Sequence, residues 1–298
     1  MRGEVFAHVA GTFAPLQLVP AVAGALLYAM RERTLRSRGA PLPAWRQWCW
    51  YGGLMLIVVT LVSPIGHISD ELFSVHMVEH LLIADIAALL LVLGLTGPML
   101  QPILHLRELR WLRVFAHPAV ALPVWAVNFY VWHLPALYQG AVENDWVHAL
   151  EHLLMVSCGI AMWMALLGPL PKPAWFGNLA RLGYIIAVRL IETVLANVLL
   201  WSGTVLYPRY AAGERYWHVS PLADQSTAGG VMMIEGSLVT IGLFCWLFLR
   251  AASQAEERQE LLELAALRGV ELSEQRAARA VAAGRGEALR RRIVGDAD

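Results

Sequence analysis

Seven apolar stretches, each about as long as a lipid bilayer is thick, dominate this sequence. A helix needs roughly 20 mostly apolar residues to cross about 30 Å of hydrocarbon. Within lipid, every backbone N–H and C=O group must find its hydrogen-bond partner inside the protein. A separate apolar segment meets this requirement by forming a helix. We therefore predict an all-α, polytopic membrane protein with seven transmembrane helices, at residues 13–30, 49–67, 75–98, 117–137, 146–167, 179–201 and 226–250.

The charged residues are unevenly distributed along the chain. Only 15% of all residues are charged, and the net charge of zero comes from 23 basic and 23 acidic side chains. Residues 251–298 hold 8 of the basic and 9 of the acidic ones. We predict a membrane domain at 1–250 and a charged, helical, cytoplasmic tail at 251–298. A soluble two-domain enzyme and a strongly basic nucleic-acid binder are excluded.

The three cysteines, Cys49, Cys158 and Cys245, are isolated within apolar stretches. None has the spacing of a redox or zinc motif, and no disulfide framework is expected. Any metal bound here must therefore use histidine, methionine or carboxylate ligands. The first apolar stretch lacks a convincing cleavage site, so no cleavable signal peptide is expected.

The loops alternate in charge, which predicts the orientation. The basic loops carry Arg31, Arg33, Arg36, Arg38 and Arg46 after the first helix and Lys172 and Arg181 after the fifth. The acidic loops carry Asp70 and Glu71 after the second and Glu143 and Asp145 after the fourth. Because basic loops stay cytoplasmic, we predict an N-terminus outside and a C-terminus inside. Eight of ten histidines then lie on the outer side: His8, His67, His76, His80, His133, His148, His152 and His218.

Two of the predicted helices open with nearly the same eight residues. Residues 75–82 read VHMVEHLL and residues 147–154 read VHALEHLL, which agree at six positions with an offset of 72. Each copy follows a histidine, His67 or His133, and a short acidic loop. We predict a duplicated two-helix hairpin, a kind of repeat known in membrane proteins.

The histidines of each copy are four residues apart, so they lie on one helix face. His76 and His80 on one helix and His148 and His152 on the other would supply four imidazoles, enough for copper, zinc or a similar ion. Glu79 and Glu151, costly to place in lipid, should face the bundle interior. Either they orient the imidazoles, or they belong to a buried hydrogen-bonded network.

Two rival interpretations share this motif. His-x-x-Glu-His is also the inverted zinc-protease signature, with the glutamate as general base, although one catalytic zinc needs only one copy. Facing histidines can also ligate haem, but paired imidazoles on one face suit a compact ion better.

The start of the last helix holds further candidates. Asp224 and Gln225 open it, and the methionines Met232 and Met233 follow. A carboxylate and thioethers could complete a metal site, since thioethers favour Cu(I). The alternative is that Asp224 caps a helix and that the methionines only pack.

The chain resembles the CtaG family, caa3-type cytochrome c oxidase assembly factors of bacterial plasma membranes. The resemblance covers about residues 10–250. It rests on the segment from Ser74 to Leu82, on Trp132-His133-Leu134-Pro135 with Tyr138, on His148 to His152, and on Asp224-Gln225 with Ala228-Gly229. Glu79 departs from the pattern, in which that position is more often Gln.

The resemblance implies a non-enzymatic, multi-pass protein of the bacterial inner membrane that assembles a haem–copper oxidase. Its partners would be oxidase subunits or other assembly factors and the lipid bilayer, with no nucleic acid. The implied copper ligands are His76, His80, His148 and His152, supported by His133 and Asp224. A zinc metallohydrolase and a copper importer or resistance protein remain the alternatives, with zinc as the alternative ion.

Overall fold

The computed structural model describes residues 15–106, 108 and 112–295, and within these it contains helices and no strands. The predicted all-α class is therefore confirmed for the described residues, while His8 lies outside them. The first unit begins with α2 (Pro15–Ser37), α3 (Ala44–Val62), α4 (Pro64–Ile68), α5 (Phe73–His80), the π-helix η1 (Leu81–Ala87), α6 (Ala88–Gly94), α7 (Gly97–His105) and α8 (Leu112–Phe115). It continues with α9 (Pro118–Trp132), α10 (Pro135–Val142), α11 (Asp145–Leu166), α12 (Asn178–Trp201), the 3-10 turn η3 (Pro208–Tyr210), α13 (Ala211–Tyr216) and α14 (Pro221–Leu267).

Helices occupy all seven stretches that the hydropathy predicts, but not all are long and apolar enough to span a membrane. Among the described residues, four qualify: Phe73–Gly94, Asp145–Leu166, Asn178–Trp201 and Pro221–Leu267. A fifth span arises if α9 and α10, which meet at 73°, are counted as one broken helix. Polar side chains in α2 and α3, such as Arg33 and Arg46, shorten their apolar lengths. Membrane helices are thus confirmed, and a count of seven spans stays a prediction.

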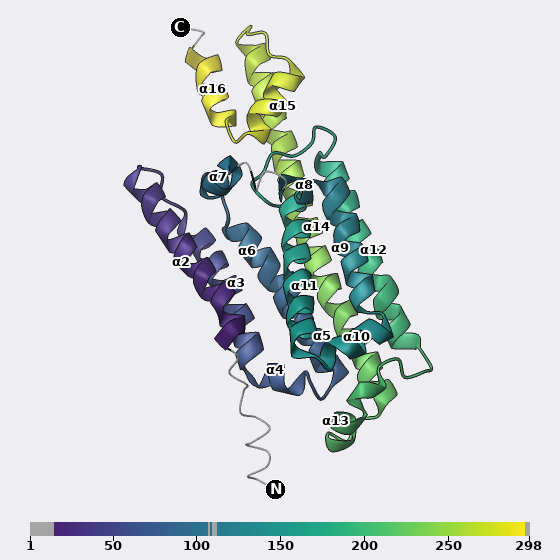
Figure 1. The fold of residues 1–298 in the computed structure, drawn as a ribbon. Coiled ribbons are helices and arrows are strands. Elements are labelled where there is room, and N and C mark those ends of the chain that lie inside the picture. Colours follow the sequence, from purple (N-terminus) through teal and green to yellow (C-terminus); the bar gives the residue numbers. More distant parts are fainter. Residues whose placement is uncertain (1–14, 107, 109–111, 296–298) are drawn as a thin grey trace. The chain divides into compact units, whose positions relative to one another are not determined.

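Prolines divide two of the predicted spans. The stretch 49–67 is interrupted after Val62, where Ser63 accepts a hydrogen bond from the backbone of Ile65 and Pro64 occupies the first turn of α4. This is a helix start that a serine cap followed by proline favours. The stretch 117–137 bends in the same way at Pro135, which opens α10. Both breaks lie at the same end of the unit as α13 (Figure 1).

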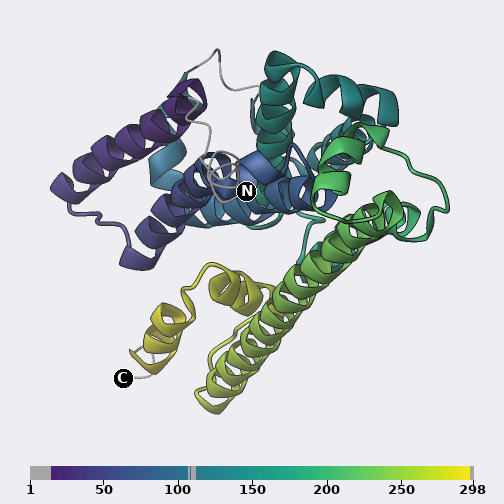
Figure 2. The same cartoon turned by 90° about the horizontal axis from the view of Figure 1, so that it is seen from below.

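The described chain divides into two compact units, Met1–Leu238 and Val239–Asp298, and α14 begins in the first. In the first unit α3 packs along α6, and α11 packs along α9, α6 and η1. Helices α2 and α3 form a pair, as both views show (Figures 1 and 2). Their packing includes a stacked pair of rings, Tyr28 and Trp50, with centroids 4.8 Å apart.

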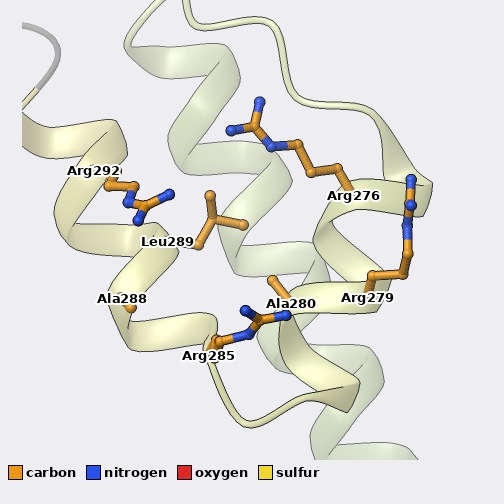
Figure 3. A pocket seen from close by; sticks show the side chains of 7 residues that line it. All are labelled: Arg276, Arg279, Ala280, Arg285, Ala288, Leu289 and Arg292. Carbon is orange, nitrogen blue, oxygen red and sulfur yellow. The ribbon is translucent and has the colours of Figure 1, made fainter.

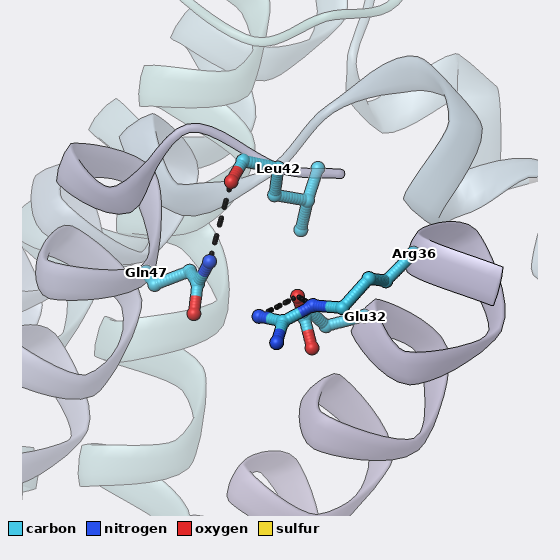
Figure 4. A network of polar contacts seen from close by, with 4 residues as sticks. All are labelled: Glu32, Arg36, Leu42 and Gln47. Carbon is cyan, nitrogen blue, oxygen red and sulfur yellow. Dashed lines mark hydrogen bonds and ion pairs between the residues drawn. The ribbon is translucent and has the colours of Figure 1, made fainter. Parts of the chain in front are cut away.

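The connection between α2 and α3 is held by local polar contacts (Figure 4). Arg36 pairs with Glu32 one turn earlier, at 2.6 Å. The side-chain amide of Gln47 donates to the backbone carbonyl of Leu42. Arg46 donates to the carbonyls of Leu93 and Leu95 at the end of α6, so it ties α3 to the helix that continues from η1.

The second unit contains the end of α14 followed by α15 (Glu274–Ala282) and α16 (Gly286–Gly295). Gly269 and Gly284, both with φ near +65°, follow α14 and α15, as helix-ending glycines do. A small core joins the three helices through Leu261, Ala265, Val281, Leu289 and Ile293. Beside it lies a cavity of about 460 Å³ around which arginines gather, shown in Figure 3: Arg276, Arg279, Arg285 and Arg292.

Candidate metal centre

The two histidine-bearing helices, α5 and α11, start at the same end of the first unit (Figure 1). Each start is fixed by a polar cap. For α11 the cap is local, because the side chain of Asn144 accepts from the backbone amides of Trp146 and Val147. For α5 it comes from α14, because the carboxylate of Asp224 accepts from the backbone amides of Phe73 and Ser74 and from the Ser74 hydroxyl. These caps place both histidine pairs within the first turns of their helices.

The four histidines of the duplicated motif form a closed ring of imidazoles. Ring centroids within a helix are 4.4 Å apart for His76 and His80 and 4.3 Å apart for His148 and His152. Between helices, His76 stacks on His148 at 5.2 Å, and His80 meets His152 edge to face at 5.1 Å. The two pairs therefore lie side by side in the structure. Only His76, His80 and His148 belong to the group of side chains whose ligand atoms come close enough for one ion, and His152 does not.

Small residues allow the two helices to come this close. Gly159 lies two turns after His152, and Ala84 lies one turn after His80, so both share a face with the histidines. A Cβ on Gly159 would lie 2.0 Å from the backbone oxygen of Ala84. Close backbone approach at small residues is a common way for membrane helices to pack. The glycine thus sets the distance between the two histidine pairs.

The imidazole group is buried, and six of its eight ring nitrogens are without a hydrogen-bond partner among the described residues. Within the described part of the chain, both ring nitrogens of His76 and His80 and the Nε2 atoms of His148 and His152 have no hydrogen-bond partner. His76 is fully buried, and His80 and His152 are more than nine-tenths buried. A buried polar atom left unpaired costs about 1–3 kcal/mol. Several such atoms pointing at one centre are expected where an ion is bound.

Glu151 contributes a carboxylate to the same centre. One ligand atom each from His76, His80, His148 and Glu151 lie within 4.8 Å of one another. Metal–nitrogen bonds of about 2 Å place ligands up to about 4 Å apart, so only small side-chain adjustments would close a site around one ion. Glu151 is fully buried, and both of its oxygens are unpartnered among the described residues. The residue chemistry and spacing therefore fit a metal ion.

The equivalent residue of the first copy, Glu79, is not part of this group of four. It is nonetheless 2% exposed, and its Oε2 lacks a partner within the described chain. The repeat is thus less symmetric in space than in sequence, since one glutamate points its oxygen at the histidines and the other does not join them. The sequence suggested the same role for both glutamates, either orienting the imidazoles or joining a polar network, and did not predict that Glu151 would be a ligand.

The two supporting candidates occupy different places. His133 follows α9 at its break, and its Nδ1 lies 2.7 Å from the carbonyl of Phe129, while Nε2 is unpartnered in the described chain. It lines a cavity together with His80 but is not one of the four grouped residues. Asp224 is also outside that group, and its carboxylate is occupied as the cap of α5. The sequence suggested Asp224 as a cap of the helix that it opens, α14, but in the structure it caps α5.

Tyrosines from α10 and from the connection after α12 lie on one side of the centre. The rings of Tyr138 and Tyr210 lie 5.2 Å and 6.4 Å from the ring of His76, and their hydroxyls are 2.7 Å apart. Tyr207 donates to the backbone carbonyl of His133. Sequence reasoning missed Tyr207 and Tyr210, for which no local motif gives a signal.

Acidic residues near this end of the unit are partly removed from water. Burial raises the pKa of Asp70 above its ordinary value, and the nearby His67 and Arg209 act in the opposite direction. Burial likewise raises the pKa of Glu214, together with the neighbouring Asp224. A raised pKa favours the neutral form, so these two carboxyl groups carry less negative charge at neutral pH than exposed ones would.

Comparison with known proteins identifies the family of this chain. A family model described as "Cytochrome c oxidase caa3 assembly factor (Caa3_CtaG)" matches residues 26–254. An uncharacterised protein of Mycobacterium bovis is 27% identical over 227 residues, which are 70% of this chain and 34% of the relative. One of Mycobacterium leprae is 25% identical over 239 residues, which are 74% and 36% of the two chains. The chain thus spans about a third of the length of these curated relatives, and no solved structure matches it.

Proposed function

We propose, from the premise that this chain belongs to the family of cytochrome c oxidase caa3 assembly factors, that it binds copper at the histidine group and aids its delivery to the oxidase. The histidine group is defined as His76, His80, His148 and His152 with Glu151. Copper is here the cargo of the protein rather than a resident cofactor.

The observation that carries this proposal is the convergence of unpaired imidazole nitrogens in the buried interior. A purely structural histidine cluster would normally satisfy its ring nitrogens by hydrogen bonds. Imidazole ligands suit both copper and zinc. Membership of an oxidase assembly family favours copper, because the product of that assembly is a haem–copper enzyme.

The direction of delivery follows from the loop charges. The connection between α2 and α3 and the one between α11 and α12 are basic, whereas Asp70 and Asp145 lie next to the histidine-bearing helix starts. By the positive-inside rule, the histidine group faces the outer side of a bacterial plasma membrane, and the C-terminal unit is cytoplasmic. The group would then receive copper outside the cell and pass it to an oxidase subunit there.

Metal analysis of the full-length protein in detergent tests the proposal. The wild type should bind one copper ion per chain at the histidine group, and the double variant His76→Ala/His148→Ala should lose that equivalent. His105→Ala, which removes an exposed histidine at the end of α7, is the matched control and should bind as the wild type does. Unchanged stoichiometry in the double variant would refute the site.

A metallohydrolase is the second candidate, because Glu151 places an unpartnered carboxylate among the histidines. In such an enzyme the glutamate would act as general base toward a metal-bound water. Glu151→Gln would then abolish cleavage of a membrane substrate while zinc stays bound. If the protein is only an assembly factor, neither the wild type nor Glu151→Gln should cleave a substrate. If it is a copper importer, vesicles that contain it should take up copper.

A further inference from the structure

A small cavity lies directly beside the histidine group and deeper in the same helices. Its volume is about 40 Å³, which is room for one or two waters or a bare ion. Its lining residues come from six helical segments of the first unit, α5, η1, α9, α11, α12 and α14, and from His133 at the break after α9. The lining residues are Met77, His80, Leu81, Ala84, Asp85, Trp125, Phe129, His133, Met155, Glu192 and Met232.

Three of these residues are methionines from three different helices. Met77 belongs to α5, Met155 to α11 and Met232 to α14, and each is more than nine-tenths buried. Methionine normally fills irregular gaps in a core, and interiors have few voids larger than a water. Here three methionine side chains line a void instead of filling it, and the side-chain amide of Asn128 donates to the Met155 sulfur at 3.5 Å.

Two imidazoles also line the cavity. The Nε2 atom of His133 is unpartnered within the described chain, while its Nδ1 is held by the Phe129 carbonyl at 2.7 Å. That contact orients the ring, as hydrogen bonds to the second nitrogen of metal-binding histidines do. His80, also without a partner for either nitrogen among the described residues, belongs both to the cavity and to the histidine group. The cavity and the histidine group are therefore adjacent.

The cavity also offers negative charge at its deep end. Asp85 and Glu192 line it, and both are more than nine-tenths buried. One base, Arg189, lies near Glu192: a Cβ on Gly236 would come within 2.6 Å of the Arg189 Nη1 and 2.8 Å of the Glu192 Oε2. Glu235 is a third carboxyl group in contact with Asp85, and the Trp163 indole donates to Asp85 at 2.7 Å, so these groups form a polar network at the deep end of the cavity.

We infer that this cavity is a second metal site, selective for Cu(I), formed by the thioethers of Met77, Met155 and Met232 with the imidazole of His133. Soft thioether ligands select Cu(I) over the divalent ions that imidazole and carboxylate accept. Copper would move between the two sites by ligand exchange at His80, with no change of oxidation state. The inference rests on the proposed function in so far as it takes copper as the cargo.

The test compares isosteric variants of the full-length protein. Met77→Leu/Met155→Leu/Met232→Leu removes all three sulfurs with little change in volume, which cores tolerate well. Met99→Leu/Met162→Leu/Met164→Leu is the matched control, because these methionines are as deeply buried but do not line the cavity. Each protein is loaded with Cu(I) under ascorbate and, separately, with Zn(II), and the bound metal is counted. X-ray absorption then distinguishes sulfur from nitrogen ligands.

We expect the cavity variant to bind one Cu(I) fewer than the control and to lose the sulfur signal, while Zn(II) binding stays unchanged. The double variant His76→Ala/His148→Ala should instead lose Zn(II) binding and keep the sulfur-coordinated Cu(I). Equal Cu(I) binding and equal sulfur signal in the cavity variant and the control would overturn this inference and leave the proposed function standing. A wild type that binds no copper would overturn both. Met155→Leu alone, expected to weaken Cu(I) binding at least tenfold, serves if the triple variant does not fold.

Discussion

Gly159→Ala tests whether α11 lies as close to η1 as the histidine group requires. The added methyl group would lie 2.0 Å from the backbone oxygen of Ala84, and real Cβ atoms essentially never approach another atom within 3.0 Å. The two helices must therefore separate by about 1 Å at this point. The Ala84 oxygen belongs to the backbone and cannot rotate away as a flexible side chain can.

The expected cost in stability follows from that displacement. Overpacking of a filled interior costs about 1–3 kcal/mol, and a clash with backbone belongs at the upper end of that range. Replacing glycine by alanine within a helix returns about 1 kcal/mol. We therefore expect Gly159→Ala to lower the free energy of unfolding by about 2 kcal/mol. Gly183→Ala on α12, where nothing lies within 4 Å of the new Cβ, should instead be neutral or slightly stabilising.

Metal binding should respond more strongly than stability. Metal–ligand distances must be met within about 0.2 Å, and the displaced contact is only two turns from His152. Zinc affinity at the histidine group, measured by chelator competition in detergent, should fall at least tenfold in Gly159→Ala and remain unchanged in Gly183→Ala. Thermal unfolding of the same samples gives the stability. If the two variants bind zinc equally and unfold at the same temperature, the close packing of α11 on η1 is wrong.

Three further predictions concern single side chains. Asp224→Ala removes three hydrogen bonds that cap α5 and should cost about 2–4 kcal/mol in thermal unfolding; unchanged metal stoichiometry would show that Asp224 caps rather than ligates. Glu151→Gln should weaken zinc binding about tenfold in chelator competition, whereas Glu79→Gln should change it less; equal effects would contradict the asymmetry of the two copies. Burial and the nearby Arg181 lower the pKa of Lys172 from 10.5 to about 8. The buried ammonium group therefore destabilises the folded protein below pH about 8, and this destabilisation disappears as the pH rises toward about 10.5. Thermal stability should accordingly rise across that window in the wild type, and Lys172→Met should abolish the rise.

The pairing of histidines could be predicted from the sequence because it depends on one helix at a time. Spacing of four residues puts His76 and His80 on one face whatever surrounds the helix. The offset of 72 residues then indicates a second, equivalent pair. The helix break at Ser63 was also accessible, since serine followed by proline favours a new helix start, although hydropathy alone runs across it.

Contacts between distant segments could not be predicted in this way. Asp224 caps a helix that begins about 150 residues earlier, and a carboxylate at the start of one helix gives no sign that it serves another. The difference between Glu79 and Glu151 is likewise invisible in two nearly identical motifs. It arises because the two copies pack against different neighbours.

Membrane helices, and a histidine pair at the start of two of them, can be predicted from the amino-acid sequence, because apolar length and a period of 3.6 residues are properties of each segment alone. The meeting of the two pairs depends on contacts between helices, with Gly159 opposite Ala84 setting their separation. So does the gathering of methionines from three helices around one cavity. Distances between helices depend on the side chains of both partners together, so no single segment contains them.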